Sequence, residues 1–249
     1  IKTIKYALEI IAPSEDNIIT IYLDEGTYSP SLTGETFSIN MISNVNLIGA
    51  GEELTILDAE QANGVIYIKD CENNVISHLK ITGGMNSIEN NGGGMELWSS
   101  NPKLTNVTIS NNYGGGMILF FSNPILTNVT ISNNTAEFFG GGMYLWYSNP
   151  KLINSIVWHN YPYFIITYID LFGSQHFHSF PIITFSNIQG GWVGEGNINA
   201  DPLFTDSDNE DYTLLPNSPC IDTGTAYLEL DGEVIVNLDE SEYIGSAPD

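Results

Sequence analysis

The stretch "SNPKLTNVTISNNYGGGM", residues 100–117, is followed by "SNPILTNVTISNN" at residues 122–134 and by "GGGM" at residues 140–143. The tripeptide Ser-Asn-Pro begins at Ser100 and recurs at Ser122 and at Ser148. The spacing of these copies falls within the range of about 20–50 residues that is typical of proteins built from stacked structural units. The sequence therefore predicts a repeat architecture before any local preference is considered.

Apolar and polar residues alternate inside each repeat, as in Met95-Glu96-Leu97 and Val107-Thr108-Ile109. Alternation with a period of two predicts β-strands that bury one face. Each repeat contains three such segments, separated by Ser-Asn-Pro, by a single Asn, and by a cluster of Asn and Gly, all of which favour turns. Three short strands per repeat predict coils of parallel strands that stack about 4.8 Å apart.

The repeats resemble those of secreted bacterial right-handed parallel β-helix proteins of the pectate-lyase-like superfamily. At the N-terminus, "IKYALEIIA" (residues 4–12) is similar to the short capping helix of these proteins, and "ITIYLDEGTYS" (residues 19–29) to their first strand. Towards the C-terminus, "YTLLPNSPCIDTGT" (residues 212–225) is similar to the closing coils of extracellular members.

This resemblance implies an all-β fold, a right-handed parallel β-helix with three strands and about 22 residues per coil and a short N-terminal capping helix. It implies a single domain over residues 1–249, with a cap and first coil in residues 1–30, the clearest repeats in residues 85–160, and a closing region in residues 200–249. It also suggests an extracellular or cell-surface location and a chain that is part of a longer polypeptide. Cys71 and Cys220 lie far apart along such a β-helix, so we expect them to be buried and unpaired.

The composition limits the possible partners. The chain has 30 acidic residues against 6 lysines and no arginine, and its formal net charge is −24. This charge repels nucleic-acid phosphates and anionic lipid surfaces, so neither is expected as a partner. No segment approaches the roughly 18 apolar residues of a membrane-spanning helix, so no membrane insertion is expected. Uronate polymers are repelled as well unless a divalent cation such as Ca²⁺ bridges the charges, so two interpretations stay open, a calcium cofactor or a plain solvated acidic surface.

One acidic stretch is a candidate calcium site. In "DPLFTDSDNEDY" (residues 201–212), the carboxylates of Asp206, Asp208, Glu210 and Asp211 approach the alternation that lets a loop wrap around Ca²⁺. The glycine and the final glutamate of an EF-hand loop are absent. A calcium site and an ordinary acidic turn are both compatible with this pattern.

Catalysis is one alternative function. The resemblance implies that lyases of this fold use an arginine or lysine as base beside calcium-binding aspartates, and this chain has no arginine. Lys69 and Lys80 flank "DCENNVISHL" (residues 70–79), and together with Asp70, its first residue, they form the stretch most similar to a lyase site. The competing interpretation is a surface ion pair and a turn histidine, His78, in the place that Asn106 takes in the next repeat.

Aromatic residues suggest the main functional hypothesis. Residues such as Trp98, Phe120/Phe121, Trp146/Tyr147 and Trp158 fall near strand ends, and coil stacking is expected to align several of them in one strip. Exposed aromatic rings stack on sugars, although rings also pack loops. With Trp98, Trp146 and Trp158 as carbohydrate contacts, the chain is interpreted as a carbohydrate-binding or adhesive scaffold for an extracellular polysaccharide or cell-surface glycan. A calcium-dependent uronate lyase and a passive structural spacer are the alternatives.

Overall fold

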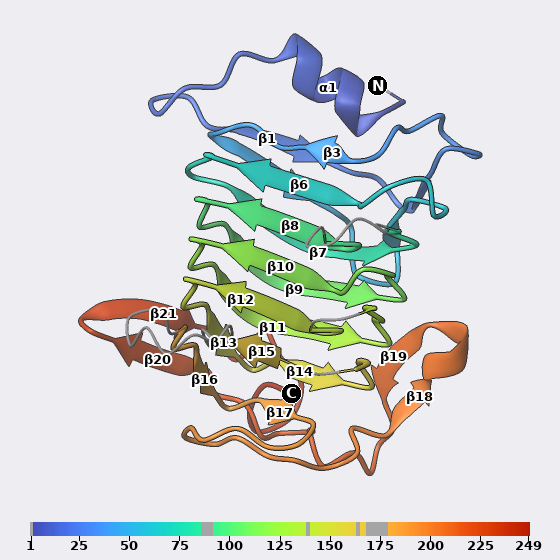
Figure 1. Cartoon of the computed structure of the whole chain (residues 1–249). Helices are drawn as coiled ribbons and strands as arrows, with labels where there is room; N and C mark the ends of the chain where they lie inside the picture. The colour runs from blue at the N-terminus through green and yellow to red at the C-terminus, as the bar shows by residue number, and fades with distance from the viewer. Residues whose placement is uncertain (1, 86–91, 138–139, 163–164, 168–178) are drawn as a thin grey trace, which may run out of the picture.

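The computed structural model describes residues 2–85, 92–137, 140–162, 165–167 and 179–249. In this part of the chain the backbone winds through stacked coils, which place parallel strands in register in two sheets (Figure 1). Among the described residues the smaller sheet has six strands, in the order β15-β12-β10-β8-β6-β3. These strands are β3 (Ile39–Asn40), β6 (Ile66–Lys69), β8 (Met95–Trp98), β10 (Met117–Phe120), β12 (Met143–Trp146) and β15 (Ile165–Thr167).

The larger sheet has eleven strands within the described residues. They are β1 (Ile19–Tyr22), β2 (Gly26–Tyr28), β4 (Val45–Ile48), β5 (Thr55–Asp58), β7 (Val75–Thr82), β9 (Lys103–Ser110), β11 (Ile125–Ser132), β13 (Lys151–Ile153), β14 (Ile156–Trp158), β16 (Ile182–Thr184) and β17 (Asn187–Ile188). In β7, β9 and β11 the second and third predicted strands of a coil form one eight-residue strand. The strand bends midway at a residue with positive φ, such as Asn106 at 52°.

Residues in the left-handed region turn the chain at three corners of each coil, and each corner recurs at the same place in successive coils. The first corner, after the strands of the six-stranded sheet, is formed by Asp70, Ser99, Phe121 and Tyr147. The second corner, within or between strands of the larger sheet, is formed by His78, Asn106, Asn128 and Asn154. The third corner is formed by Asn111, Asn133 and His159. Asn and Asp adopt this conformation more easily than other non-glycine residues, which explains much of the repeat's asparagine content.

The core runs through the inside of the coils. Leu97, Leu119 and Leu145 are register neighbours in β8, β10 and β12, and all three are fully buried. Stacking like residues in this way buries a continuous apolar column along the coils. Cys71 belongs to the same core, and Cys71 and Cys220 are both buried and free, as the sequence predicts.

Asparagine side chains continue the hydrogen bonding between coils in the interior near the third corner. The Nδ2 atom of Asn112 donates to Oδ1 of Asn134 at 2.9 Å, and Nδ2 of Asn134 donates to Oδ1 of Asn160 at 3.0 Å. The glycine run of each repeat makes room for these amides. A Cβ atom at Gly116 would lie 2.8 Å from the carbonyl oxygen of Gly142 and 2.9 Å from Nδ2 of Asn134.

The N-terminal end of the core is covered by helix α1 (Ile4–Ile10). Its residues Ile4, Ala7 and Leu8 are buried, at the spacing that places them on one helical face. The buried carboxylate of Glu35 accepts hydrogen bonds from the backbone N–H groups of Ile4 and Lys5 at 2.5 and 3.3 Å, which satisfies donors that a helix start leaves unpaired. The short capping helix that the sequence predicts is therefore present. Among the described residues no helix is long and apolar enough to cross a membrane.

The C-terminal region differs from the closing coils that the resemblance implied. After a last short bridge between Asn187 and Ile198, the chain forms two antiparallel hairpins instead of further parallel coils. Figure 1 shows them on opposite sides of the stacked coils. The first comprises β18 (Phe204–Asp206), the 3₁₀ turn η1 (Ser207–Asn209) and β19 (Asp211–Leu214), and the second comprises β20 (Tyr227–Leu230) and β21 (Glu233–Asn237).

Candidate functional site

The outer face of the six-stranded sheet carries an aromatic row, Trp98, Phe120 and Trp146. These are the last residues of β8, β10 and β12 and are register neighbours. The Trp98 and Phe120 rings stack with centroids 4.0 Å apart, and the Phe120 and Trp146 rings are 6.3 Å apart at 48°. Phe120 is buried, whereas both tryptophans are partly exposed. The predicted alignment of Trp98 and Trp146 is therefore confirmed.

A buried carboxylate lies beside this row. Oε1 of Glu96 accepts a hydrogen bond from Nε1 of Trp98 at 2.5 Å, and only 7% of Glu96 is exposed. Burial raises the pKa of Glu96, and this effect exceeds the lowering by hydrogen bonds from Trp98 and the Gly92 backbone. Tyr67 is the register neighbour of Glu96 in β6, and its pKa is raised by burial first and then by the Glu96 charge. Glu96 thus fixes the orientation of the Trp98 indole at the edge of the row.

The row continues at the first corner with a second pair of rings, Phe121 and Tyr147, here called the aromatic corner. Their ring centroids lie 4.9 Å apart at 24°, and the Tyr147 ring is 6.0 Å from that of Trp146. Both residues have positive φ, 51° for Phe121 and 50° for Tyr147, and 51% of Phe121 is exposed. The aromatic row and the aromatic corner together form a ring-lined surface that turns around one edge of the coils.

Trp158 does not belong to this surface. The prediction that it lies in the same strip as Trp98 and Trp146 is therefore wrong. It ends β14 in the larger sheet, where its register neighbour is Ser132 of β11, and only 8% of it is exposed. The sequence places Trp158 at the end of a strand, as it does Trp98. The strand is the third of its coil and not the first, so the ring lies near the third corner.

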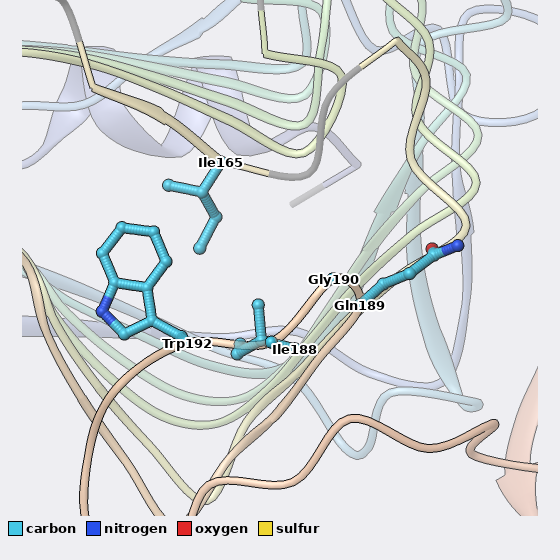
Figure 2. A pocket seen from close by; sticks show the side chains of 6 residues that line it. Ile165, Ile188, Gln189, Gly190 and Trp192 are labelled. Atoms are coloured by element: carbon cyan, nitrogen blue, oxygen red, sulfur yellow. The ribbon is translucent and has the colours of Figure 1, made fainter.

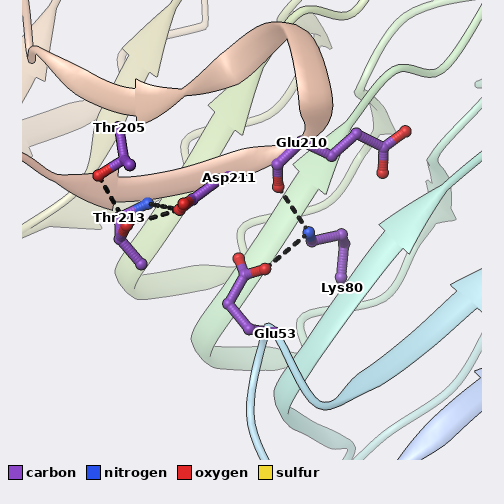
Figure 3. Close-up of polar contacts among 6 residues, drawn as sticks. All are labelled: Glu53, Lys80, Thr205, Glu210, Asp211 and Thr213. Atoms are coloured by element: carbon purple, nitrogen blue, oxygen red, sulfur yellow. Dashed lines mark hydrogen bonds and ion pairs between the residues drawn. The ribbon is translucent and has the colours of Figure 1, made fainter.

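The structure does not bring together the residues of the suggested lyase site. Lys69 is exposed at the end of β6 and Asp70 follows it at the first corner, whereas Lys80 lies in β7 of the other sheet and is buried. Nζ of Lys80 donates to the Glu210 carbonyl at 2.8 Å and forms an ion pair with Glu53 at 3.1 Å (Figure 3). The first hairpin therefore covers Lys80, and the hydrogen bond from Lys80 to Glu210 attaches the hairpin to β7.

His78 takes the place of an asparagine at the second corner, as the competing interpretation predicts. Its Nε2 atom lies 3.0 Å from Nδ2 of Asn106, and Nδ2 of Asn128 donates to Oδ1 of Asn106 at 3.1 Å. This ladder does not continue to Asn154. The Asn154 side chain instead donates to the Thr225 carbonyl at 2.9 Å and accepts from the Thr225 N–H at 2.8 Å.

The four acidic residues of the candidate calcium site lie on the first hairpin, and two of them are engaged within it. Asp206 Oδ2 accepts from Nδ2 of Asn209 at 2.8 Å, and Asp211 Oδ1 accepts from the backbone N–H and the hydroxyl of Thr213. These hydrogen bonds lower the pKa of Asp211. Asp208 is exposed on η1, and the Glu210 carboxylate points away from Lys80 (Figure 3). Nowhere in the described residues do three or more His, Cys, Asp or Glu side chains gather to hold a metal ion.

A cavity of about 160 Å³ lies where the coiled core ends. Ile165, Ile188 and Trp192 surround it, while the Gln189 side chain points away from them (Figure 2). The backbone of Gly190 and Gly191 completes the lining. Among the described residues that line the cavity none has a titratable side chain, and Ile165, Ile188 and Trp192 offer apolar contact.

Comparison with known proteins identifies the fold family. The chain belongs to the family described as "Right handed beta helix region", which matches residues 32–195, more than half of the chain. The predicted right-handed parallel β-helix is thereby confirmed. Comparison with curated proteins gives no match.

Two solved structures are similar to the chain. One is a crystal structure of pectin methylesterase in complex with a hexasaccharide, which is 12% identical, has a TM-score of 0.40, and aligns over 86% of this chain and 94% of that chain. The other is a mutant of pectin methylesterase with a second hexasaccharide, at 11% identity, a TM-score of 0.38 and the same coverage. Likeness at this level carries no information about activity or ligand.

Proposed function

We propose that this chain is a carbohydrate-binding module whose sugar-binding surface is the aromatic corner with the adjoining aromatic row. The observation that carries the proposal is Phe121, an exposed ring with φ of 51° that stacks on Tyr147. A bulky residue in the left-handed region is uncommon, and sparsely populated backbone conformations cost of order 1–3 kcal/mol. Asp70 and Ser99 hold the same corner in earlier coils with small side chains.

An exposed ring kept at a strained position is poorly explained by packing alone. Phe121 fills no core space, because half of its surface is in contact with solvent. The stacked Phe121 and Tyr147 rings leave their edges and outer sides as an apolar surface against which the C–H groups of a pyranose pack, while the sugar hydroxyls bind polar groups nearby. A binding function requires the Phe121 ring at the corner of the coil, and this requirement accounts for the strained backbone conformation there.

The two alternative functions have weaker support. A lysine-based lyase requires a base that substrate reaches, and Lys80 is buried beneath the first hairpin on a different sheet from Lys69. A passive spacer requires no exposed aromatic surface at all. The proposal includes a location outside the cell or at its surface, and detection of the chain by antibody on intact cells tests that part.

Affinity electrophoresis tests the proposal. The purified chain is run in gels that contain galactomannan, xylan, hydroxyethylcellulose or polygalacturonate, and retardation by at least one polymer is expected. Phe121→Asn should abolish the retardation, whereas Tyr22→Asn, which changes an exposed ring on β1, should not. Incubation of the same polymers should release no unsaturated chain ends, the product of a lyase.

Stability measurements separate binding from folding. In Phe121→Asn the relief of backbone strain offsets the lost ring stacking, about 1 kcal/mol each, so the free energy of unfolding should change by less than about 1 kcal/mol. In Phe120→Ala the loss of a buried ring should cost about 3–5 kcal/mol. If Phe121→Asn is destabilised as strongly as Phe120→Ala, or is retarded like the unchanged chain, the ring serves packing and the proposal is wrong.

A further inference from the structure

We infer that the ligand is an extended neutral glycan that lies parallel to the axis of the coils along the first corner, with one sugar unit per coil. This inference rests on the proposed function and adds the ligand's class and direction. It comes from a second row of side chains, the amide row, formed by Asn101, Asn123 and Asn149. Each of them follows the corner residue of its coil by two positions, and all three are exposed.

Hydrogen bonds between coils orient every amide in the same way. Oδ1 of Asn101 accepts from the backbone N–H of Asn123, and Oδ1 of Asn123 accepts from that of Asn149, both at 2.6 Å. Oδ1 of Asn149 accepts from the N–H of Phe180 at 2.5 Å. Because each oxygen is committed to the next coil, the Nδ2 groups remain as donors. Within the described chain these Nδ2 groups have no acceptor.

Neighbouring residues hold the amide row rigid. Ser122, before Asn123, is buried, and its hydroxyl donates to the Phe120 carbonyl at 2.8 Å while accepting from the Ser100 N–H at 3.1 Å. Pro124, after Asn123, is buried and restricts the backbone on both sides of the peptide bond. The Ser-Asn-Pro motif therefore presents a pre-organised donor on each coil, and pre-organisation reduces the entropic cost of binding.

The spacing and polarity of the aromatic corner and the amide row match an extended glycan. Successive coils are about 4.8 Å apart, close to the length of one pyranose unit in an extended chain. Asn123 lies in the same coil as Phe121, and Asn149 in the same coil as Tyr147, so these two coils offer a ring beside an amide donor. Asn101 follows Ser99, so its coil offers the amide donor alone at this corner. Sugar hydroxyl and ring oxygens accept from such donors. With a net charge of −24 the chain repels polyanions, which favours a neutral glycan over a uronate polymer.

Calorimetry with β-1,4-linked oligosaccharides of glucose, mannose and xylose, from two to six units long, tests the inference. Affinity should rise with length up to about three units, which is one per amide, and then level off. Asn123→Asp keeps an acceptor for the Asn149 N–H but removes the donor, and should weaken binding about tenfold. Asn149→Asp is the second variant and should behave in the same way. Asn237→Asp on β21 adds the same charge at an exposed site on the second hairpin and should bind like the unchanged chain.

The outcomes separate this inference from the proposed function. If the unchanged chain binds none of the oligosaccharides and none of the polymers, the proposed function itself is wrong. If binding occurs and Phe121→Asn abolishes it, but Asn123→Asp and Asn149→Asp bind like Asn237→Asp, the amide row takes no part and the inference is overturned. Tighter binding of oligogalacturonates than of the neutral series overturns the ligand class, and affinity that does not depend on length overturns the direction.

Discussion

At the scale of single residues, Glu96 makes the stability of the chain depend on pH. Its pKa in the folded state is raised above the ordinary value of 4.5, so the folded state holds this proton more tightly than the unfolded state does. Stability from this group is therefore lost as pH rises from about 4.5 through the folded-state pKa. We expect Glu96→Gln to raise the unfolding midpoint at pH 7 and to leave it unchanged near pH 3.5. Thermal unfolding at both pH values measures this, and equal effects at both would contradict it.

Asn134 allows a second test, of the interior amide ladder. Its side chain accepts from the N–H of Asn112 at 3.1 Å and donates to the Ile109 carbonyl at 2.9 Å, both in the buried interior. Asn134→Ala leaves these groups without partners, and we expect a loss of about 3 kcal/mol in the free energy of unfolding. The exposed Asn101→Ala should cost about 1 kcal/mol or less, because water replaces the lost contact. Urea titration of both variants measures the difference, and similar losses would show that burial does not set the cost.

Single-residue roles were predictable where the repeat defines them. Alternation and coil register place Trp98 and Trp146 on one outer face, and the Asn106 position explains His78. The corner position of Phe121 was harder to predict, since the sequence shows two adjacent aromatic residues at 120 and 121 without showing which one turns the corner. Comparison with Ser99 in the previous coil is the signal that identifies it.

At the scale of elements, the first hairpin is fastened to the coils by Lys80. Nζ of Lys80 lies 5.8 Å from the centroid of the Tyr212 ring and bonds the Glu210 carbonyl, while Glu53 remains partly exposed. Lys80→Met keeps the aliphatic length but removes the anchor, so we expect faster amide exchange in residues 204–214 and unchanged protection of β9 and β11. Hydrogen exchange with peptide resolution measures this. Unchanged exchange in the hairpin would mean that other contacts, such as the 3.1 Å hydrogen bond from Asn133 to the Ser207 carbonyl, are enough to hold it.

The acidic residues of this hairpin give a prediction about metal removal. Asp206 and Asp211 face each other across the two strands and are held by hydrogen bonds within the hairpin. A ligand that binds only the folded state raises the unfolding midpoint in proportion to the logarithm of its concentration. We expect treatment with EDTA and readdition of millimolar CaCl₂ to shift the midpoint no more than MgCl₂ does. A shift of several degrees specific to calcium would instead establish the calcium site that the sequence suggested.

The sequence predicts the coils far better than the hairpins, for a physical reason. A coil is specified by local alternation and by the next copy of the repeat, as residues 122–134 repeat residues 100–112 almost unchanged. The hairpin's place depends on contacts such as that between Lys80 and Glu210, which are far apart in the sequence and lie outside the repeat. No periodic pattern encodes such a contact, so the burial of Lys80 and the absence of further closing coils among the described residues are evident only in the structure.

At the scale of the whole molecule, the charge of −24 makes stability depend on salt. Self-repulsion of a highly charged chain disfavours the compact state, and salt screens it over a Debye length of about 8 Å at physiological ionic strength. We expect the unfolding midpoint at pH 7 to rise by about 3 °C between 10 mM and 0.5 M NaCl. Near pH 4, where many carboxylates are protonated, the rise should be smaller. An equal rise at both pH values would point to a general salt effect and not to charge screening.

The closing region also changes how the molecule as a whole is expected to unfold. In a simple solenoid each coil contacts only its neighbours, so the terminal coil can fray alone and unfolding spreads from that end. Here residues after position 200 bond Lys80 in β7, Asn133 after β11 and Asn154 between β13 and β14. The last coils therefore cannot unfold one at a time unless this C-terminal segment first loses its contacts with the coils. The C-terminal segment thus couples distant coils and turns a chain of nearly independent units into a more cooperative one, with a single transition in place of gradual fraying.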